Sequence, residues 1–202
     1  MIRLSALLLL LLALPLHAQE LPAFYSVSGV AADDVLNIRA APEATAPVLG
    51  TLAPNATGVE VISIVDGWAV VNAQDVTGYA KLSFLEREAG PDWNTLAMPL
   101  TCLGTEPFWS LAIDPEAGKA GFLTPEDQEP RVSAITRTWP GAPWARAAAL
   151  ELPEGLAVLS PAECSDGMSD RSYGIAVDLF LTTADPDIGR DRLSGCCLLA
   201  AP

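Results

Sequence analysis

Short stretches in which hydrophobic and polar residues alternate, separated by turn residues, run along the chain from residue 21 onward. Alternation with a period of two is typical of half-buried β-strands. Asp66-Gly67 is a signal for a tight β-hairpin turn. Up to residue 88 the pattern predicts five short strands, at residues 35–39, 48–52, 59–65, 68–71 and 77–80. Five short strands with frequent turns predict a small β-barrel.

The pattern is lost over residues 89–98, where charged residues, glycine and proline predict a linker. It returns from residue 99 to the end of the chain, at residue 202. Residues 144–152 are ambiguous, because their alanines favour a helix whereas the flanking prolines and the β neighbourhood favour a strand. The other expected strands lie at residues 108–113, 119–123, 132–139, 156–159 and 173–182. We therefore expect a second all-β domain of about six to eight strands, either open or closed into a barrel.

The first 18 residues have the composition of a secretory signal peptide, cleaved after Ala18. Arg3 supplies the positive start, and the apolar run from Leu7 to Leu14 is shorter than the ~20 residues that a membrane-spanning helix needs. The alternative is an uncleaved membrane anchor. The sequence predicts a periplasmic or secreted protein without a transmembrane anchor after cleavage.

Charge and histidine content exclude several classes of function. The formal net charge is −14, and it becomes −15 when Arg3 leaves with the signal peptide. Nucleic acid is therefore a poor partner, because phosphates repel such a surface. The single histidine, His17, also leaves with the leader. The mature chain cannot build a Ser-His-Asp or Cys-His site or a histidine-containing zinc site, and we expect no metal and no cofactor.

Four cysteines in an exported chain predict two disulfides. The adjacent Cys196 and Cys197 are poor partners for one another, because a bridge between neighbours is strained, and on a strand they would point to opposite faces. We prefer the pairs Cys164–Cys196 and Cys102–Cys197, although the exchanged pairing fits almost equally well. A zinc site with four cysteines would normally show paired C-x₂-C spacing, which this sequence lacks.

Residues 25–88 resemble a bacterial SH3 (SH3b) domain. The resemblance rests on Leu36-Asn37-Ile38-Arg39, Pro42, Val48-Leu49-Gly50, Gly67-Trp68, Gly78-Tyr79 and Leu85. It implies a binding module, with domain boundaries at residues 19–88, of a kind found on exported bacterial proteins that in some cases bind cell-wall peptide or glycan. The candidate ligand-binding residues are Arg39, Trp68 and Tyr79. Core packing is the favoured interpretation of Trp68, whereas Arg39 either binds a carboxylate or pairs with Asp33 or Asp34.

Residues 99–198 resemble an uncharacterised family of bacterial envelope proteins. The resemblance rests on Gly104-Thr-Glu-Pro-Phe-Trp109, on Cys164-Ser-Asp-Gly-Met-Ser-Asp170 with Tyr173, and on Gly195-Cys196-Cys197. Many relatives have proline where Gly174 stands. No activity follows from this resemblance, and the predicted fold class is all-β: a small SH3-like barrel followed by a second, disulfide-tied β-barrel or β-sheet domain.

The second motif, residues 164–170, is called here the Cys164 loop. If the two motifs meet, Glu106, Asp166 and Asp170 form a carboxylate cluster that could bind calcium or act as an acid and base on a glycan. The favoured interpretation is structural: the aspartates accept backbone N–H bonds in an Asx-type turn beside a disulfide. Trp109 is a further candidate ligand-binding residue, although core packing is favoured for it.

The leading hypothesis is a non-catalytic exported binding protein. Its SH3b-like domain would recognise a cell-envelope component, either peptidoglycan peptide or glycan or an envelope protein. The first alternative is a cell-wall hydrolase that uses Glu106, Asp166 or Asp170. The second is an inhibitor of an envelope enzyme that presents the Cys164 loop.

Overall fold

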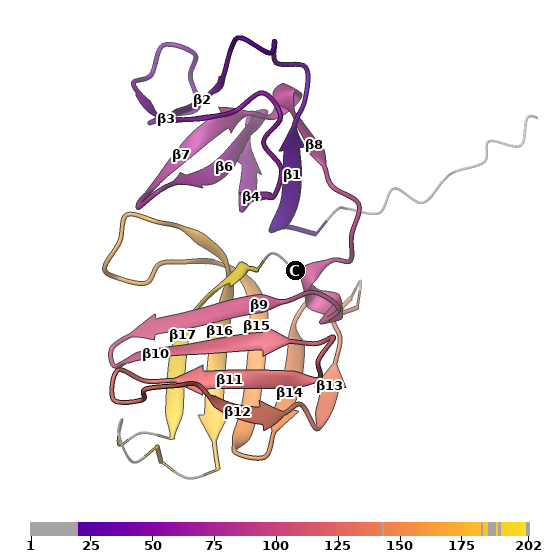
Figure 1. The fold of residues 1–202 in the computed structure, drawn as a ribbon, viewed down its shortest axis with the longest axis vertical. Helices are drawn as coiled ribbons and strands as arrows, with labels where there is room; N and C mark the ends of the chain where they lie inside the picture. Colours follow the sequence, from indigo (N-terminus) through magenta and orange to yellow (C-terminus); the bar gives the residue numbers. More distant parts are fainter. Residues whose placement is uncertain (1–19, 143, 183, 186–188, 190, 201–202) are drawn as a thin grey trace, which may run out of the picture.

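The computed structural model describes residues 20–200 except 143, 183, 186–188 and 190. The expected signal peptide lies outside the described residues. The described chain forms two β units, one from residues 20–88 and one from residues 99–200, which lie above one another in Figure 1. The predicted all-β fold class is confirmed. None of the helices in the described part of the chain is long and apolar enough to cross a membrane.

The N-terminal β unit consists of two small sheets packed on a common core, with strand orders β4-β1-β8 and β3-β2-β7-β6-β5. All five predicted strand regions are extended, and β1 and β8 were not predicted. The elements are β1 (Ala23–Val27), β2 (Leu36–Arg39), β3 (Val48–Leu52), β4 (Val59–Val61), β5 (Ser63–Val65), β6 (Trp68–Ala73), β7 (Val76–Lys81), η1 (Leu82–Phe84) and β8 (Leu85–Arg87).

The expected single strand at residues 59–65 is wrong, because Ile62 divides it between the two sheets. β4 pairs with β1, whereas β5 forms a hairpin with β6. Both Val61 and Ile62 are buried, so the chain changes sheet at a corner of the core. A continuous β-branched run cannot reveal such a corner. The predicted Asp66-Gly67 turn is confirmed, and both residues have positive φ, 50° and 77°.

The C-terminal β unit is one nine-stranded antiparallel sheet, one strand more than the upper limit expected. Its order is β12-β11-β10-β9-β17-β16-β15-β14-β13. The strands are β9 (Leu100–Thr105), β10 (Phe108–Asp114), β11 (Lys119–Leu123), β12 (Arg131–Ala134), β13 (Arg137–Trp139), β14 (Ala148–Leu152), β15 (Gly155–Cys164), β16 (Tyr173–Leu181) and β17 (Arg192–Leu199). In Figure 1, β9–β12 run across β13–β17, so the sheet curls into two layers around its own hydrophobic core.

Two further strand predictions concern this sheet. The expected strand at residues 132–139 is wrong, because it divides into β12 and β13, which stand at opposite ends of the sheet. Only Ile135 and Thr136 join them, so the curled sheet brings its two edges together. The ambiguous segment 144–152 contains a strand, β14, and no α-helix.

The segment expected to be a linker is packed against both units. It contains a 3₁₀ turn, η2 (Trp93–Thr95), in which Trp93 is fully buried in the C-terminal core. The indole Nε1–H of Trp93 donates to the carbonyl oxygen of Leu21 over 3.1 Å. Composition alone could not distinguish this anchored connection from a solvated spacer.

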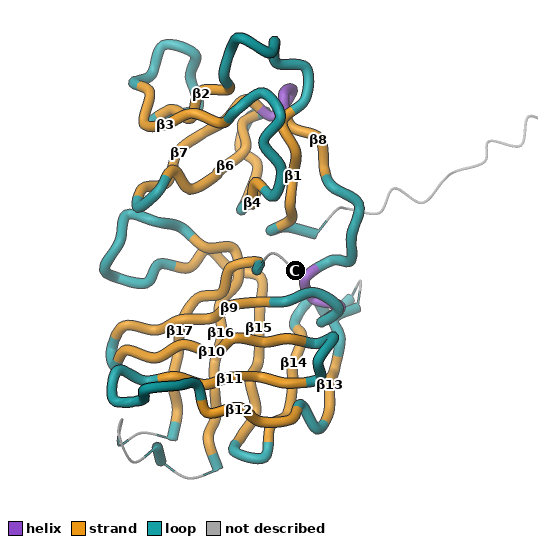
Figure 2. The backbone as a smooth tube through the Cα atoms, viewed as in Figure 1, coloured by secondary structure: helices purple, strands orange, loops and turns teal. Residues whose placement is uncertain are grey.

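The Cys164 loop also joins the two units. In Figure 2 it extends from the end of β15 to the hairpin of β6 and β7. The N–H of Thr77 donates to the carbonyl oxygen of Asp170 over 2.9 Å, and the N–H of Ser172 donates to Thr77 Oγ1 over 2.7 Å. Asn72 Nδ2 donates to the carbonyl oxygen of Ser172 over 2.9 Å. One of these bonds joins two backbones, as in an added strand, and the other two use the side chains of Thr77 and Asn72, so Asp170 and the nearby Ser172 are fixed on the β6–β7 hairpin.

Candidate functional site

The outer face of the five-stranded sheet presents a row of polar and aromatic side chains. Residues opposite one another on antiparallel strands share a face of the sheet. Trp68 of β6 lies opposite Lys81 of β7, and Arg39 of β2 lies opposite Tyr79 of β7. Sequence-distant residues are therefore brought into one surface by the register of three strands.

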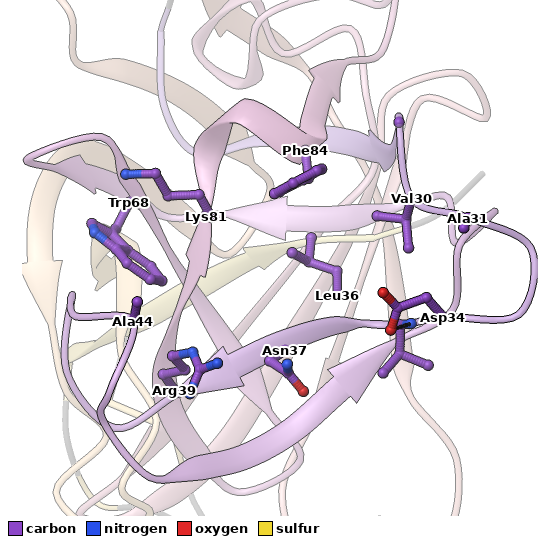
Figure 3. A pocket seen from close by; sticks show the side chains of 12 residues that line it. Val30, Ala31, Asp34, Leu36, Asn37, Arg39, Ala44, Trp68, Lys81 and Phe84 are labelled. Atoms are coloured by element: carbon purple, nitrogen blue, oxygen red, sulfur yellow. Dashed lines mark hydrogen bonds between the residues drawn. The ribbon is translucent and has the colours of Figure 1, made fainter.

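A groove of about 600 Å³ occupies one end of this surface. Arg39, Trp68 and Lys81 lie at one end of the groove, and Asp34 lies at the other end (Figure 3). Leu36 and Phe84 supply apolar surface between them. The groove can therefore hold an extended ligand that has an apolar middle and an anionic end.

The cationic end of the groove is held in place by specific contacts. Arg39 Nη1 donates to the carbonyl oxygen of Ala46 over 2.8 Å. Lys81 Nζ lies 4.9 Å from the ring centroid of Trp68, within the range of a cation–π interaction. Trp68 is 8% exposed, so it forms a wall of the groove rather than a free platform. The low exposure of Trp68 agrees with its expected packing role, and the part of the side chain that stays accessible lines the groove.

Tyr79 lines a different cavity. This second cavity, of about 430 Å³, lies between the two units and is lined by Tyr79, Val70 and Thr77 from one side and by Glu163 and Tyr173 from the other. The structure thus brings Arg39 and Trp68 together but places Tyr79 in the neighbouring space. Lys81 was missed as a site residue. Its position two residues after Tyr79, on the same face of a strand, was the available signal.

The preferred disulfide pairing is confirmed. Cys102 bonds to Cys197, its direct cross-strand partner on β17, and Cys164 bonds to Cys196. Neighbouring residues of β17 therefore bond on opposite faces of the sheet, one inside the core and one to the Cys164 loop. Two disulfides fit an extracytoplasmic protein.

Asp166 organises the Cys164 loop. Its Oδ1 accepts the N–H groups of Met168 and Ser169, over 3.0 and 2.9 Å. Its Oδ2 accepts the hydroxyls of Ser169 and Tyr173, over 2.8 and 3.1 Å. Burial alone would raise the pKa of Asp166, but these four donors outweigh it and lower the pKa to about 2. The expected Asx-type turn is confirmed for Asp166.

The other predicted residues of this unit are not gathered into one cluster. Glu106 and Asp166 line a surface cavity of about 510 Å³ together with Phe108 and Met168, which are 50% and 68% exposed. Asp170 is placed at the contact with Thr77 through its backbone carbonyl. Within the described ranges, no three acidic, cysteine or histidine side chains are grouped closely enough to hold a metal ion.

Trp109 belongs to the core of the C-terminal unit and is 4% exposed. Its ring stacks on Phe122 with centroids 6.0 Å apart and covers Gly104 on the facing strand. A Cβ atom at Gly104 would come within 2.2 Å of Trp109 Nε1, so glycine is required for the ring to lie there. Packing thus explains Gly104 and Trp109 of the motif.

Comparison with known proteins identifies one part of the chain. Residues 34–86 match the family model of the bacterial SH3 domain. This match supports the resemblance of the N-terminal unit, and its span includes Arg39, Trp68, Tyr79 and Lys81. No curated protein and no solved structure matches the chain. The resemblance of residues 99–198 to an envelope-protein family stays a prediction.

Proposed function

We propose that the protein is a non-catalytic, exported binding protein, periplasmic or secreted, whose N-terminal unit binds the peptide component of the bacterial cell wall. The observation that carries this proposal is the groove on the unit that matches the bacterial SH3 domain. Such a domain suggests wall binding, and the groove supplies a specific surface for it.

The chemistry of the groove favours a peptide with a carboxylate group. Arg39 and Lys81 are two of only ten basic residues that remain once Arg3 leaves a chain with eleven. Both lie at the same end of the groove, next to Trp68. On a strongly acidic protein, this end is a local site for an anionic group. The apolar surface of Leu36 and Phe84 then suits small aliphatic side chains.

The geometry of the acidic residues supports a hydrolase less well than it supports a binding protein. A carboxyl group with a pKa of about 2 does not hold a proton at neutral pH, so Asp166 is unsuited to act as a general acid. Its two oxygens already accept four hydrogen bonds, which suits a structural role. Asp170 reaches the contact between the units through its backbone carbonyl, which accepts the N–H of Thr77. We therefore propose that the Asp166 carboxylate serves structure rather than catalysis.

Co-sedimentation with purified peptidoglycan tests the proposal. We expect the mature wild-type protein to sediment with the wall and Lys81→Ala to bind at least about tenfold more weakly, since a charge-assisted contact contributes roughly 1.5–3 kcal/mol. The chain contains only one other lysine, Lys119, which is exposed on β11 of the C-terminal unit. Lys119→Ala is the matched control, because it makes the same change of charge away from the groove.

The outcomes are distinct. Failure of the wild-type protein to sediment would exclude wall binding. Equal weakening by Lys81→Ala and Lys119→Ala would show that overall charge, and not the groove, determines binding.

A further inference from the structure

The groove and the cavity between the units are adjacent parts of one surface. Arg39 lines the groove and Tyr79 lines the cavity, yet the two residues are direct cross-strand neighbours on the same sheet face. Side chains in such pairs start about 5 Å apart. Along β7, Lys81, Tyr79 and Thr77 follow one another on this face, over about 13 Å at the usual rise of a strand. A ligand that leaves the groove past Lys81 therefore enters the cavity.

The C-terminal unit supplies the far wall of this cavity and its charge. Arg146 contributes a guanidinium group, but it is paired with both carboxylate oxygens of Glu20, with Nε 2.9 Å from each. Glu163 is exposed and lines the same cavity from the end of β15. The paired charges of Arg146 and Glu20 cancel, so Glu163 is, among the described residues that line the cavity, the one acidic residue without an opposite charge beside it. Arg171 does not line the cavity, although its guanidinium lies over the ring of Tyr173, which does. The other polar groups there, such as Tyr79, Thr77 and Ser172, are neutral.

The two ends of the surface thus have opposite charge, cationic at Arg39 and Lys81 and anionic at Glu163. We propose that the two units form one composite binding site, in which an extended wall peptide places a carboxylate at Lys81 and an amine at Glu163. The inference rests on the proposed function and adds a ligand chemistry and a role for the C-terminal unit. The bonds from Asp170 and Ser172 to Thr77 and Asn72 hold the two walls of the site together.

Blocking the amines of the ligand tests this arrangement. Purified peptidoglycan is used as isolated and after acetylation of its free amines with acetic anhydride. We expect the wild-type protein to bind the acetylated wall about tenfold more weakly, because a charge-assisted hydrogen bond is lost. Glu163→Gln should bind the untreated wall more weakly and should no longer distinguish it from the acetylated wall. Lys81→Ala should weaken binding to both walls.

Asp34→Asn is the matched control, because Asp34 is the acidic residue at the opposite end of the groove. We expect Asp34→Asn to retain the sensitivity to acetylation. If Asp34→Asn loses that sensitivity and Glu163→Gln retains it, the amine binds within the groove and the composite site is wrong.

Equal wild-type binding to both walls would likewise overturn the inference while leaving the proposed function intact. Binding to glycan strands stripped of peptide would identify a glycan ligand and would contradict both this inference and the peptide ligand of the proposed function. Failure of the wild-type protein to bind either wall would instead refute the proposed function itself.

Discussion

At the scale of single residues, Asp166 shows how one side chain can fix a loop. Its carboxylate replaces the backbone hydrogen bonds that a regular strand would supply to residues 168 and 169. The sequence allowed this role to be predicted, because an aspartate followed by Gly167 is a common turn signal. The participation of Tyr173 could not be predicted, since it depends on where β16 begins.

Asp166→Asn should destabilise the protein by roughly 1–3 kcal/mol at neutral pH, because an amide cannot accept all four donors. The lowered pKa of Asp166 means that its contribution is present above the usual value of 3.8 and is lost as the pH falls through about 2. Urea unfolding at pH 7 and pH 2 should therefore show a difference between variant and wild type that shrinks in acid. Asp114→Asn, in an exposed turn where the carboxylate accepts the N–H of Ala117, is the control and should have a smaller effect. Equal stability of Asp166→Asn and wild type at pH 7 would contradict the role assigned here.

At the scale of elements, the strands whose sequences alternate were predictable and those fixed by tertiary contacts were not. The hairpin of β10 and β11 follows directly from its alternation and its turn. β1 and β8 were missed because each is a short strand whose identity depends on pairing with the other. Both failures at residues 59–65 and 132–139 have a common cause: a strand pattern records which residues are extended but not the point at which the chain changes sheet.

The disulfide Cys164–Cys196 should stabilise both the fold and the docking of the Cys164 loop. It closes a sequence separation of 32 residues, for which chain-entropy arguments predict about 3–4 kcal/mol. We expect the double variant Cys164→Ser/Cys196→Ser to unfold at a correspondingly lower urea concentration. Hydrogen exchange of the Thr77 and Ser172 amides, which bond across the contact, should become faster in the variant.

The amide of Ala120 provides an internal reference for that measurement, because it lies in β11, which is remote from the loop in the sheet order. If exchange at Thr77 and Ser172 rises only as much as at Ala120, the disulfide contributes to global stability alone. Unchanged exchange at all three amides would mean that the loop is held by its other contacts.

At the scale of the whole molecule, the association of the two units was the least predictable feature. Composition indicated a linker at residues 89–98, whereas Trp93, the Cys164 loop and Glu60 all tie the units together. The candidate groove was predictable in part, since Arg39 and Trp68 belong to recognisable SH3b motifs. The cavity between the units was not predictable, because Glu163 and Tyr79 are far apart in the sequence and line the same cavity only through the docking of the units.

Glu60 makes this association dependent on pH. Its Oε1 accepts the N–H of Leu199 from the C-terminal unit over 3.1 Å. Burial raises the pKa of Glu60 to about 7, although the bond from Leu199 and the charge of Arg171 partly oppose the effect. In the unfolded chain the Glu60 carboxyl loses this proton near its ordinary pKa of 4.5, whereas in the folded protein it keeps the proton until about pH 7. The free energy of unfolding should therefore fall as the pH rises through this window, by up to roughly 3 kcal/mol.

Glu60→Gln keeps an oxygen for the Leu199 N–H and removes the charge, so it should be more stable than wild type at pH 8 and nearly equal to it at pH 4. Urea unfolding across this range measures the difference. The control is Glu86→Gln on β8, an exposed residue of the same small sheet, which should retain the wild-type dependence on pH. If the free energy of unfolding depends on pH in the same way for Glu60→Gln and wild type, ionisation of Glu60 does not destabilise the contact between the units. If only Glu60→Gln loses the fall in the free energy of unfolding with rising pH, Glu60 is the group that titrates, and it lies at the contact between the units. Acid then strengthens the association of the units that the composite site requires.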